Sequence, residues 1–296
     1  MNKNIKPKDW NNISSEDMDK YLQDSWEWSL DFIGNNSIDV VEITTAEYYL
    51  QDDGVDYGVN YDIKKSIKSI EGQQHIYDFY FNIKAKLKSE TRVSKYHGLE
   101  HIFDMLHQID LCSEHIVRRD AVECAAFLHE YTFNPLRYDN VLRNAANAIQ
   151  ILTAYGDSYD GIYYNDIIPY YYSNWVYGLI KAMESTIFYE EDEKYFRDAH
   201  LAIYGSEWNT FERYLNGIKD EYDRAVSKIG PHLDLENKIY GSFFGRVPHC
   251  FCTPEKIDGH IFVTDFFKDL YEENAQKNYA KQIVWVKERV KDMPVI

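Results

Sequence analysis

The stretch from residue 96 to residue 130 organises the chain and reads YHGLEHIFDMLHQIDLCSEHIVRRDAVECAAFLHE. His97 and His101 stand four residues apart, so on a helix they lie on one face, one turn apart. A second pair, His129 and Glu130, directly follows an apolar run that predicts a helix buried on nearly every side. Burying Glu130 alone would cost several kcal/mol, so its carboxylate must be neutral, paired or bound to a cation. We take the cation as the working hypothesis.

Composition and charge limit the class of protein before any motif is considered. The chain has 296 residues, 45% hydrophobic and 16% aromatic, enough for a full core in one large domain or in one domain plus an extension. The formal net charge of −17 argues against a nucleic acid or an anionic membrane as partner, and leaves room only for a local basic pocket. The four cysteines lack CxxC spacing, and no early apolar run of about 18 residues occurs. We therefore expect a globular cytoplasmic protein with reduced thiols, without a signal peptide or a membrane span.

Hydrophobic periodicity predicts an all-α protein with a small mixed N-terminal extension. We assign residues 1–70 to this extension: the capping box Ser14-x-x-Asp17 begins an amphipathic helix, and the β-branched residues that follow favour a short strand. Residues 71–296 are assigned to a helical domain. Its predicted helices have apolar stripes at residues 76–87, 99–106, 121–128, 141–152, 179–187, 196–203, 208–222, 262–271 and 275–290. The Tyr-rich segment 155–173 has little helical period and is predicted to be a packed loop, a lid or an interface.

Three motifs, in their order and spacing, resemble those of the HD superfamily of metal-dependent phosphohydrolases. They are Tyr96-His97-x-x-x-His101, His129-Glu130 followed by Phe133-Asn134-Pro135, and Arg197-Asp198-Ala199-His200-Leu201-Ala202-Ile203-Tyr204-Gly205. The similarity is to the bacterial branch of predicted HD phosphohydrolases, whose pattern is roughly YHNxxH, then FHD-x-x-Y-x-P, then DADLAILG. Three later motifs also fit that branch: Glu221-Tyr222, Phe244-Gly245-Arg246 and Glu272-x-x-Ala275-x-x-Asn278. The resemblance covers residues from about 80 to 290.

The resemblance implies an all-α HD-domain bundle in which histidine and carboxylate side chains hold one or two divalent metal ions. Such an ion lowers the pKa of its bound water and neutralises charge that develops on a phosphoryl oxygen. Residue by residue, His101 matches the first ligand of the family and His129 matches the second. His97 matches the histidine that protonates the leaving oxygen in the similar cyclic-nucleotide phosphodiesterases.

Two ligand positions depart from the family pattern. Glu130 stands where the family has aspartate, so its carboxylate reaches one methylene further. His200 stands at the second aspartate of DADL, and Asp198 is the alternative ligand; two such positions on a helix point about 200° apart, so only one can face the metal. We predict His200 as the ligand, because it shares an apolar face with Phe196 and Ile203. A set of three histidines and one glutamate favours zinc, iron or manganese over magnesium, since imidazole suits the borderline metals.

Each of these side chains also has an ordinary structural explanation. The two histidines four residues apart are compatible with a simple helical pair. Glu130 could instead form a buried ion pair with Arg143 or Lys181, and His200 could be a core histidine bonded to a carbonyl. The stretch that follows Lys181 also lacks a histidine that the bacterial branch usually carries. The sequence therefore predicts the fold more strongly than it predicts the activity.

Three functional hypotheses follow from these observations. The first is a metal-dependent phosphohydrolase acting on a nucleotide or another small phosphate ester, with homo-oligomer formation left open. The residues assigned to it are the metal ligands His101, His129, Glu130 and His200 with Asp198 in reserve, the catalytic residues His97 and Glu130, and the substrate-binding residue Arg246. The second is a catalytically degenerate HD-fold protein that binds a nucleotide-like ligand or a partner protein without turnover. The third, a histidine-rich oxygenase with two irons, needs further histidines between Glu130 and His200, where the sequence has none.

Overall fold

The computed structural model of this chain describes residues 13–26, 83–86, 96–157, 170–229, 249–251 and 253–289. The regular elements within these residues are helices, and no β-strand occurs among them; Ile257 and His260 form an isolated antiparallel bridge. The all-α prediction is therefore confirmed for the described part of the chain. The predicted short strand, most of the Tyr-rich segment and Arg246 lie outside it.

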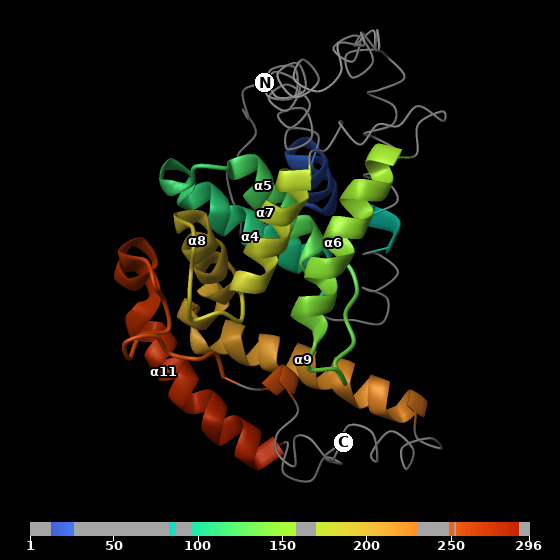
Figure 1. Cartoon of the computed structure of the whole chain (residues 1–296). Coiled ribbons are helices and arrows are strands. Elements are labelled where there is room, and N and C mark those ends of the chain that lie inside the picture. Colours follow the sequence, from blue (N-terminus) through green and yellow to red (C-terminus); the bar gives the residue numbers. More distant parts are fainter. Residues whose placement is uncertain are drawn as a thin grey trace, which may run out of the picture.

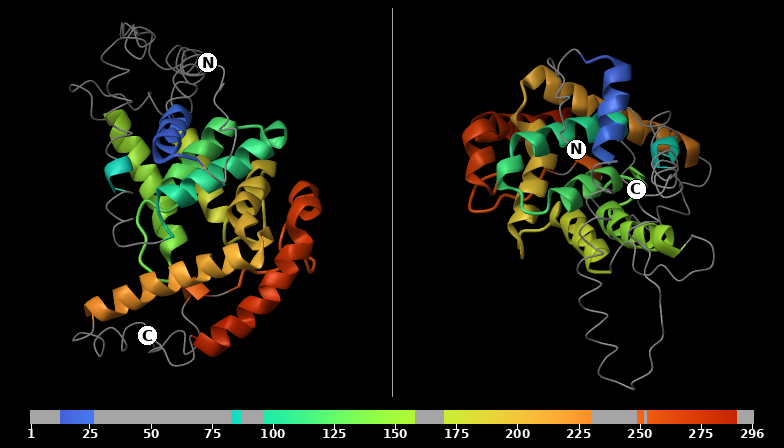
Figure 2. Two further views of the ribbon diagram at one scale, coloured as in Figure 1. Left: turned by 180° about the vertical axis from the view of Figure 1, so that it is seen from behind. Right: turned by 90° about the horizontal axis from the view of Figure 1, so that it is seen from above.

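The helices form a bundle with α9 running across one end (Figure 1). In chain order the elements are α4 (Leu99–Leu111), η2 (Ser113–His115), α5 (Arg119–Leu128), α6 (Asn140–Asp157), α7 (Tyr170–Ala182), α8 (Glu191–Leu201), η3 (Ala202–Gly205), α9 (Trp208–Ile229), η5 (His249–Phe251) and α11 (Asp265–Arg289). The pair α5 and α7 forms the centre, with α4 and α6 packed on α5 and with α6 and α8 packed on α7. The long helix α11 packs on η3. In the view from behind, α11 lies at the outer edge of the bundle (Figure 2). No described helix is both long and apolar enough to pass through a bilayer.

Helix α5 is buried along nearly its whole length, as its apolar sequence predicts. All residues from Asp120 to Leu128 are inaccessible to solvent or nearly so. Its two acidic residues are neutralised locally, because Arg118 pairs with Asp120 and Arg119 pairs with Glu123. The helix therefore places His129 and Glu130, which follow its C-terminal end, in the protein interior.

A helix in the N-terminal extension, described over residues 15–26, packs into the same core as the bundle. Its start is capped as predicted: the Ser14 hydroxyl oxygen accepts the backbone N–H of Asp17 at 3.0 Å. Tyr21 donates its hydroxyl hydrogen to Asp110 of α4 at 2.6 Å. Trp26 is fully buried and meets Phe127 of α5 edge to face, with ring centroids 5.1 Å apart. Part of the extension is thus a component of the main core, while the boundary predicted at residue 70 falls outside the described residues.

The limits of α7 differ from the sequence prediction at both ends. The helix begins at Tyr170, inside the Tyr-rich segment that was expected to lack helical structure. Tyr172 is fully buried, so packing against α5 and α6 outweighs the weak helical propensity of a tyrosine run. At the other end α7 stops at Ala182, and Ile187, expected on its apolar stripe, is 66% exposed in the following loop.

The two amphipathic stretches expected at the C-terminus are one continuous helix. Helix α11 runs from Asp265 to Arg289 without interruption. No glycine or proline separates the stretches, and Ala275 and Asn278 at their junction are both buried. The residues between the stripes therefore continue the helix instead of ending it.

A close contact between η3 and α11 requires glycine at position 205. A Cβ atom on Gly205 would lie 2.4 Å from the Cβ atom of Tyr271, an atom too near the α11 backbone to move away easily. We expect Gly205→Ala to lower the free energy of unfolding by about 1–3 kcal/mol through overpacking. Urea denaturation of both proteins measures the effect. Gly217→Ala is the matched control, because its new Cβ makes only an ordinary contact at 3.4 Å; an equal loss in both variants would contradict the prediction.

Candidate metal centre

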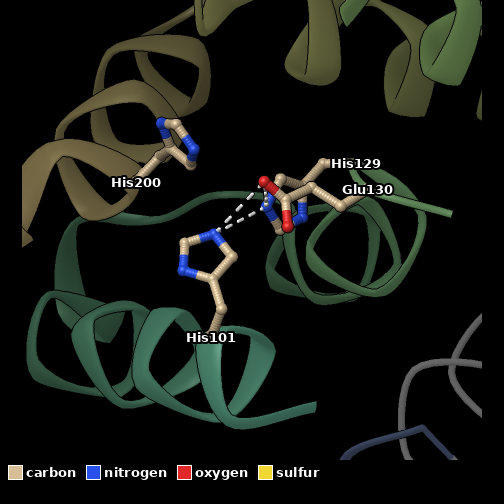
Figure 3. Close-up of side chains that lie close together, drawn as sticks. All are labelled: His101, His129, Glu130 and His200. Carbon is tan, nitrogen blue, oxygen red and sulfur yellow. Dashed lines mark hydrogen bonds and ion pairs between the residues drawn. The ribbon is translucent and has the colours of Figure 1, made fainter. Parts of the chain in front are cut away.

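Four of the predicted ligands come together where α4, α5 and α8 meet (Figure 3). His101 lies in the first turn of α4, which begins after the extended residue Gly98. His129 is the C-terminal cap of α5 and Glu130 follows it directly. His200 is the penultimate residue of α8. Each side chain is therefore held near a helix end, and three separate elements supply the set.

The donor atoms are close enough to surround one small cation. Each of the four residues offers one ligand atom, and these atoms all lie within 4.8 Å of one another. The Nε2 atoms of His101 and His129 are 3.1 Å apart, and the Glu130 Oε1 atom lies 3.7 and 3.8 Å from them. The His200 ring centroid is 5.5 Å from the ring centroids of both other histidines. This geometry supports a metal-binding group, with His101, His129 and Glu130 buried and His200 partly buried.

A backbone hydrogen bond fixes the tautomer of His129. Its Nδ1 atom lies 2.7 Å from the Ala126 carbonyl oxygen, which can only accept, so Nδ1 carries the hydrogen. The Nε2 atom of the neutral ring then presents a lone pair toward His101. A histidine whose other nitrogen donates to a backbone carbonyl is the usual arrangement at metal sites.

The protein interior keeps the three histidines neutral. Burial, with the neighbouring imidazoles, lowers the pKa of His101 and of His200 well below the usual value, and burial lowers the pKa of His129 to about 4. All three rings are therefore unprotonated at neutral pH and can donate lone pairs without first losing a proton. Burial also raises the pKa of Glu130 to about 7, an effect that nearby His97 reduces.

Two buried polar atoms of the cluster have no hydrogen-bond partner among the described residues. They are Oε2 of Glu130 and Nδ1 of His200. An unsatisfied buried carboxylate oxygen is costly, and a divalent cation in the cluster would offset the charge of Glu130. The Nε2 atoms of His101 and His129 face each other, so without an ion one of them must carry a hydrogen that the other accepts. A bound cation would remove that requirement. The donor set and its unsatisfied atoms therefore fit a metal ion.

His97 lies beside the cluster and is held by a second acidic residue, Glu221. The His97 Nδ1 atom lies 2.5 Å from Glu221 Oε2, while Glu221 Oε1 accepts the backbone N–H groups of Tyr96 at 2.5 Å and of His97 at 3.2 Å. The His97 ring also stacks on Phe133, with centroids 3.6 Å apart. These contacts direct Nε2 toward the cluster, 3.4 Å from Glu130 Oε1.

The pKa of His97 shifts in the opposite direction from the pKa values of the three clustered histidines. Burial alone would lower its pKa, but Glu130 and Glu221 outweigh burial and raise the pKa of His97. Among the histidines at the cluster, His97 is thus the one whose surroundings stabilise the protonated ring. Sequence reasoning gave Glu221 no role, although its place in a motif similar to the HD branch was a signal.

Asp198, the reserve ligand, lies outside the cluster and binds the loop before α11. Its carboxylate accepts the backbone N–H groups of Val263 and Thr264 at 3.0 and 2.7 Å, and the Thr264 hydroxyl at 2.8 Å. Arg197 lies 3.5 Å from it and donates to the carbonyl oxygens of Ile261 and Glu255, both at 2.8 Å. Two residues apart on α8, Asp198 and His200 therefore serve different parts of the structure, as helical geometry requires.

The ordinary explanations of the cluster find little support in the described residues. The ionisable side chains next to Glu130 there are His97, His101 and His129, and neither Arg143 nor Lys181 pairs with it. The Nδ1 atom of His200 makes no hydrogen bond to a carbonyl. No protein-family model, curated protein or solved structure matches the chain. The case for a metal site therefore depends on this geometry.

Proposed function

We propose that this protein is a metal-dependent phosphohydrolase of the HD type, acting on a nucleotide or another small phosphate ester. The observation that carries the proposal is the convergence of four donor side chains from three elements, with a separately held histidine beside them. The motif resemblance described above supplies the reaction class. The net charge of −17 favours a small phosphorylated molecule over a nucleic-acid polymer as substrate.

The residues divide into a binding set and a proton-donating set. His101, His129, Glu130 and His200 would hold a divalent ion, with zinc, iron or manganese preferred over magnesium because of the imidazole content. When bound, such an ion supplies Lewis acidity and makes a water molecule more acidic.

In this proposal His97 gives a proton to the leaving oxygen. Its Nδ1 atom is anchored to Glu221, which leaves Nε2 as the atom that faces the cluster. Proton donation to a leaving group requires a charged imidazole, the form that the two neighbouring carboxylates favour. Glu221 then acts as a positioning residue, since it holds the ring without facing the substrate. In this proposal Glu130 binds the ion and also supports the charge of His97, and Arg246 contacts the substrate phosphate.

Two measurements on the full chain, purified without chelator, test the proposal. Elemental analysis should find a bound transition metal, and a panel of nucleotides and small phosphate esters should yield inorganic phosphate with at least one member. Metal bound without turnover on any substrate would favour the degenerate, ligand-binding alternative, which the replacement of both family aspartates at positions 130 and 200 also motivates. Absence of both metal and turnover would defeat the proposal.

Replacing the predicted proton donor should separate its role from metal binding. We expect His97→Asn to lower kcat by about 10²–10⁴-fold on an alkyl phosphate, because general acid catalysis typically contributes that much. On a p-nitrophenyl ester the loss should be smaller, since that leaving group departs without a proton. The bound metal content should be unchanged. An equal loss on both substrates, or loss of the metal, would contradict the assignment of His97 as proton donor.

A further inference from the structure

We infer that the cluster holds a single ion rather than two, and that His200 is the residue that determines which metal is chosen. This inference deepens the proposed function and rests on its metal-binding part. It is carried by the spacing of the four donors, by the commitment of the nearby carboxylates to other partners, and by the chemistry of an imidazole at position 200.

The spacing of the donors suits one ion. Ligand atoms about 2.0–2.2 Å from a single zinc ion can be no more than about 4.4 Å apart. The four donors already lie within 4.8 Å of one another, so small side-chain movements would complete the site. Two-metal sites separate their ions by about 3.5–4 Å and need bridging carboxylates and a set of ligands for each ion. Three imidazoles and one carboxylate are too few for that arrangement.

The other carboxylates near the cluster are already committed. Asp198 accepts three hydrogen bonds from Val263 and Thr264 and stays on the opposite side of α8. Glu221 accepts two backbone N–H groups and holds the His97 ring. Recruiting either one to a second ion would leave buried N–H and O–H donors without acceptors, which is unfavourable in the protein interior. Among the described residues, Glu130 is therefore the carboxylate available to an ion, since its buried Oε2 atom has no hydrogen-bond partner there.

The imidazole at position 200 makes the site rich in nitrogen. Magnesium and, to a lesser degree, manganese prefer oxygen ligands, whereas zinc and iron accept imidazole readily. With aspartate at this position the set would have two histidines and two carboxylates and would carry one more negative charge. A His200→Asp change would therefore alter both the charge and the donor type of the site, at the position where the similar HD branch carries aspartate.

Metal titrations of chelator-stripped full-length protein test the inference. Calorimetry with zinc and with manganese should give one ion per chain, with zinc bound about 100-fold more tightly or better, following the general order of divalent affinities. His200→Asp should narrow this preference by about tenfold or more, because it replaces a nitrogen donor by an oxygen donor. His115→Asp makes the same chemical change at an exposed histidine of η2 and should leave the preference unchanged. Circular dichroism and thermal melting confirm that each variant is folded, and the absorption spectrum of the cobalt-substituted protein reports the ligand set in both variants.

The possible results separate the inference from the proposed function. Two ions per chain, or an unchanged zinc preference in a folded His200→Asp protein, would overturn the inference even if phosphate is released. A change of the cobalt spectrum in His115→Asp alone would overturn it as well. One zinc ion per chain without phosphate release from any substrate would leave the inference standing and overturn the proposed hydrolase.

Discussion

His101→Ala is expected to abolish metal binding and, with it, phosphate release. His101 donates from the first turn of α4, and its Nε2 atom lies 3.1 Å from Nε2 of His129 at the centre of the cluster. Losing a residue that only orients a ligand typically weakens metal affinity by about 10–100-fold, so losing a ligand should weaken it by more. Elemental analysis of the purified variant and calorimetric titration with zinc measure the effect.

The control for this variant is His115→Ala, which removes an exposed imidazole from η2 and should leave the metal content unchanged. The fold of His101→Ala should survive, because a buried imidazole is exchanged for a smaller side chain in a helix that other residues anchor. Metal content near the original value in the folded variant would contradict the ligand assignment and, with it, the proposed function.

Asp198→Ala is expected to destabilise the protein strongly without removing the metal from the folded fraction. Asp198 is fully buried beside Arg197, and its carboxylate accepts the backbone N–H groups of Val263 and Thr264. Removing one partner of a buried ion pair typically costs about 3–5 kcal/mol, because it leaves the remaining charge uncompensated. Urea denaturation gives the change in the free energy of unfolding.

The matched control is Asp269→Ala, an exposed aspartate of α11, which should change the free energy of unfolding by no more than about 0.5 kcal/mol. The opposite outcome for Asp198→Ala, with stability intact and the metal lost, would make Asp198 the ligand and reverse the roles of the two α8 residues.

The sequence was sufficient to predict the buried helix and the convergence of the four donors. The apolar run that forms α5 ends at Leu128, so the polar residues that follow it had to be placed in the interior. The choice of His200 over Asp198 came from the apolar face that His200 shares with Phe196. The structure places His200 within the cluster and Asp198 outside it.

Other features depended on contacts between distant segments and were not legible in the sequence. The bond between His97 and Glu221 joins residues 124 positions apart, and no local pattern specifies it. The start of α7 inside the Tyr-rich segment follows from burial of Tyr172 against its neighbours, which periodicity cannot show. The partners of Asp198 belong to the loop before α11, so its structural role became visible only in three dimensions.

The packing of the N-terminal helix has a consequence for how this protein can be shortened. Tyr21 lies against Phe103 and Trp26 against Phe127, with ring centroids 5.4 and 5.1 Å apart. A truncation that starts at residue 71 would strip these two phenylalanines of their cover and expose aromatic surface beside the helices that carry His101 and His129. Such a fragment would be prone to aggregate, so the N-terminal helix belongs in any expressed form of the helical domain.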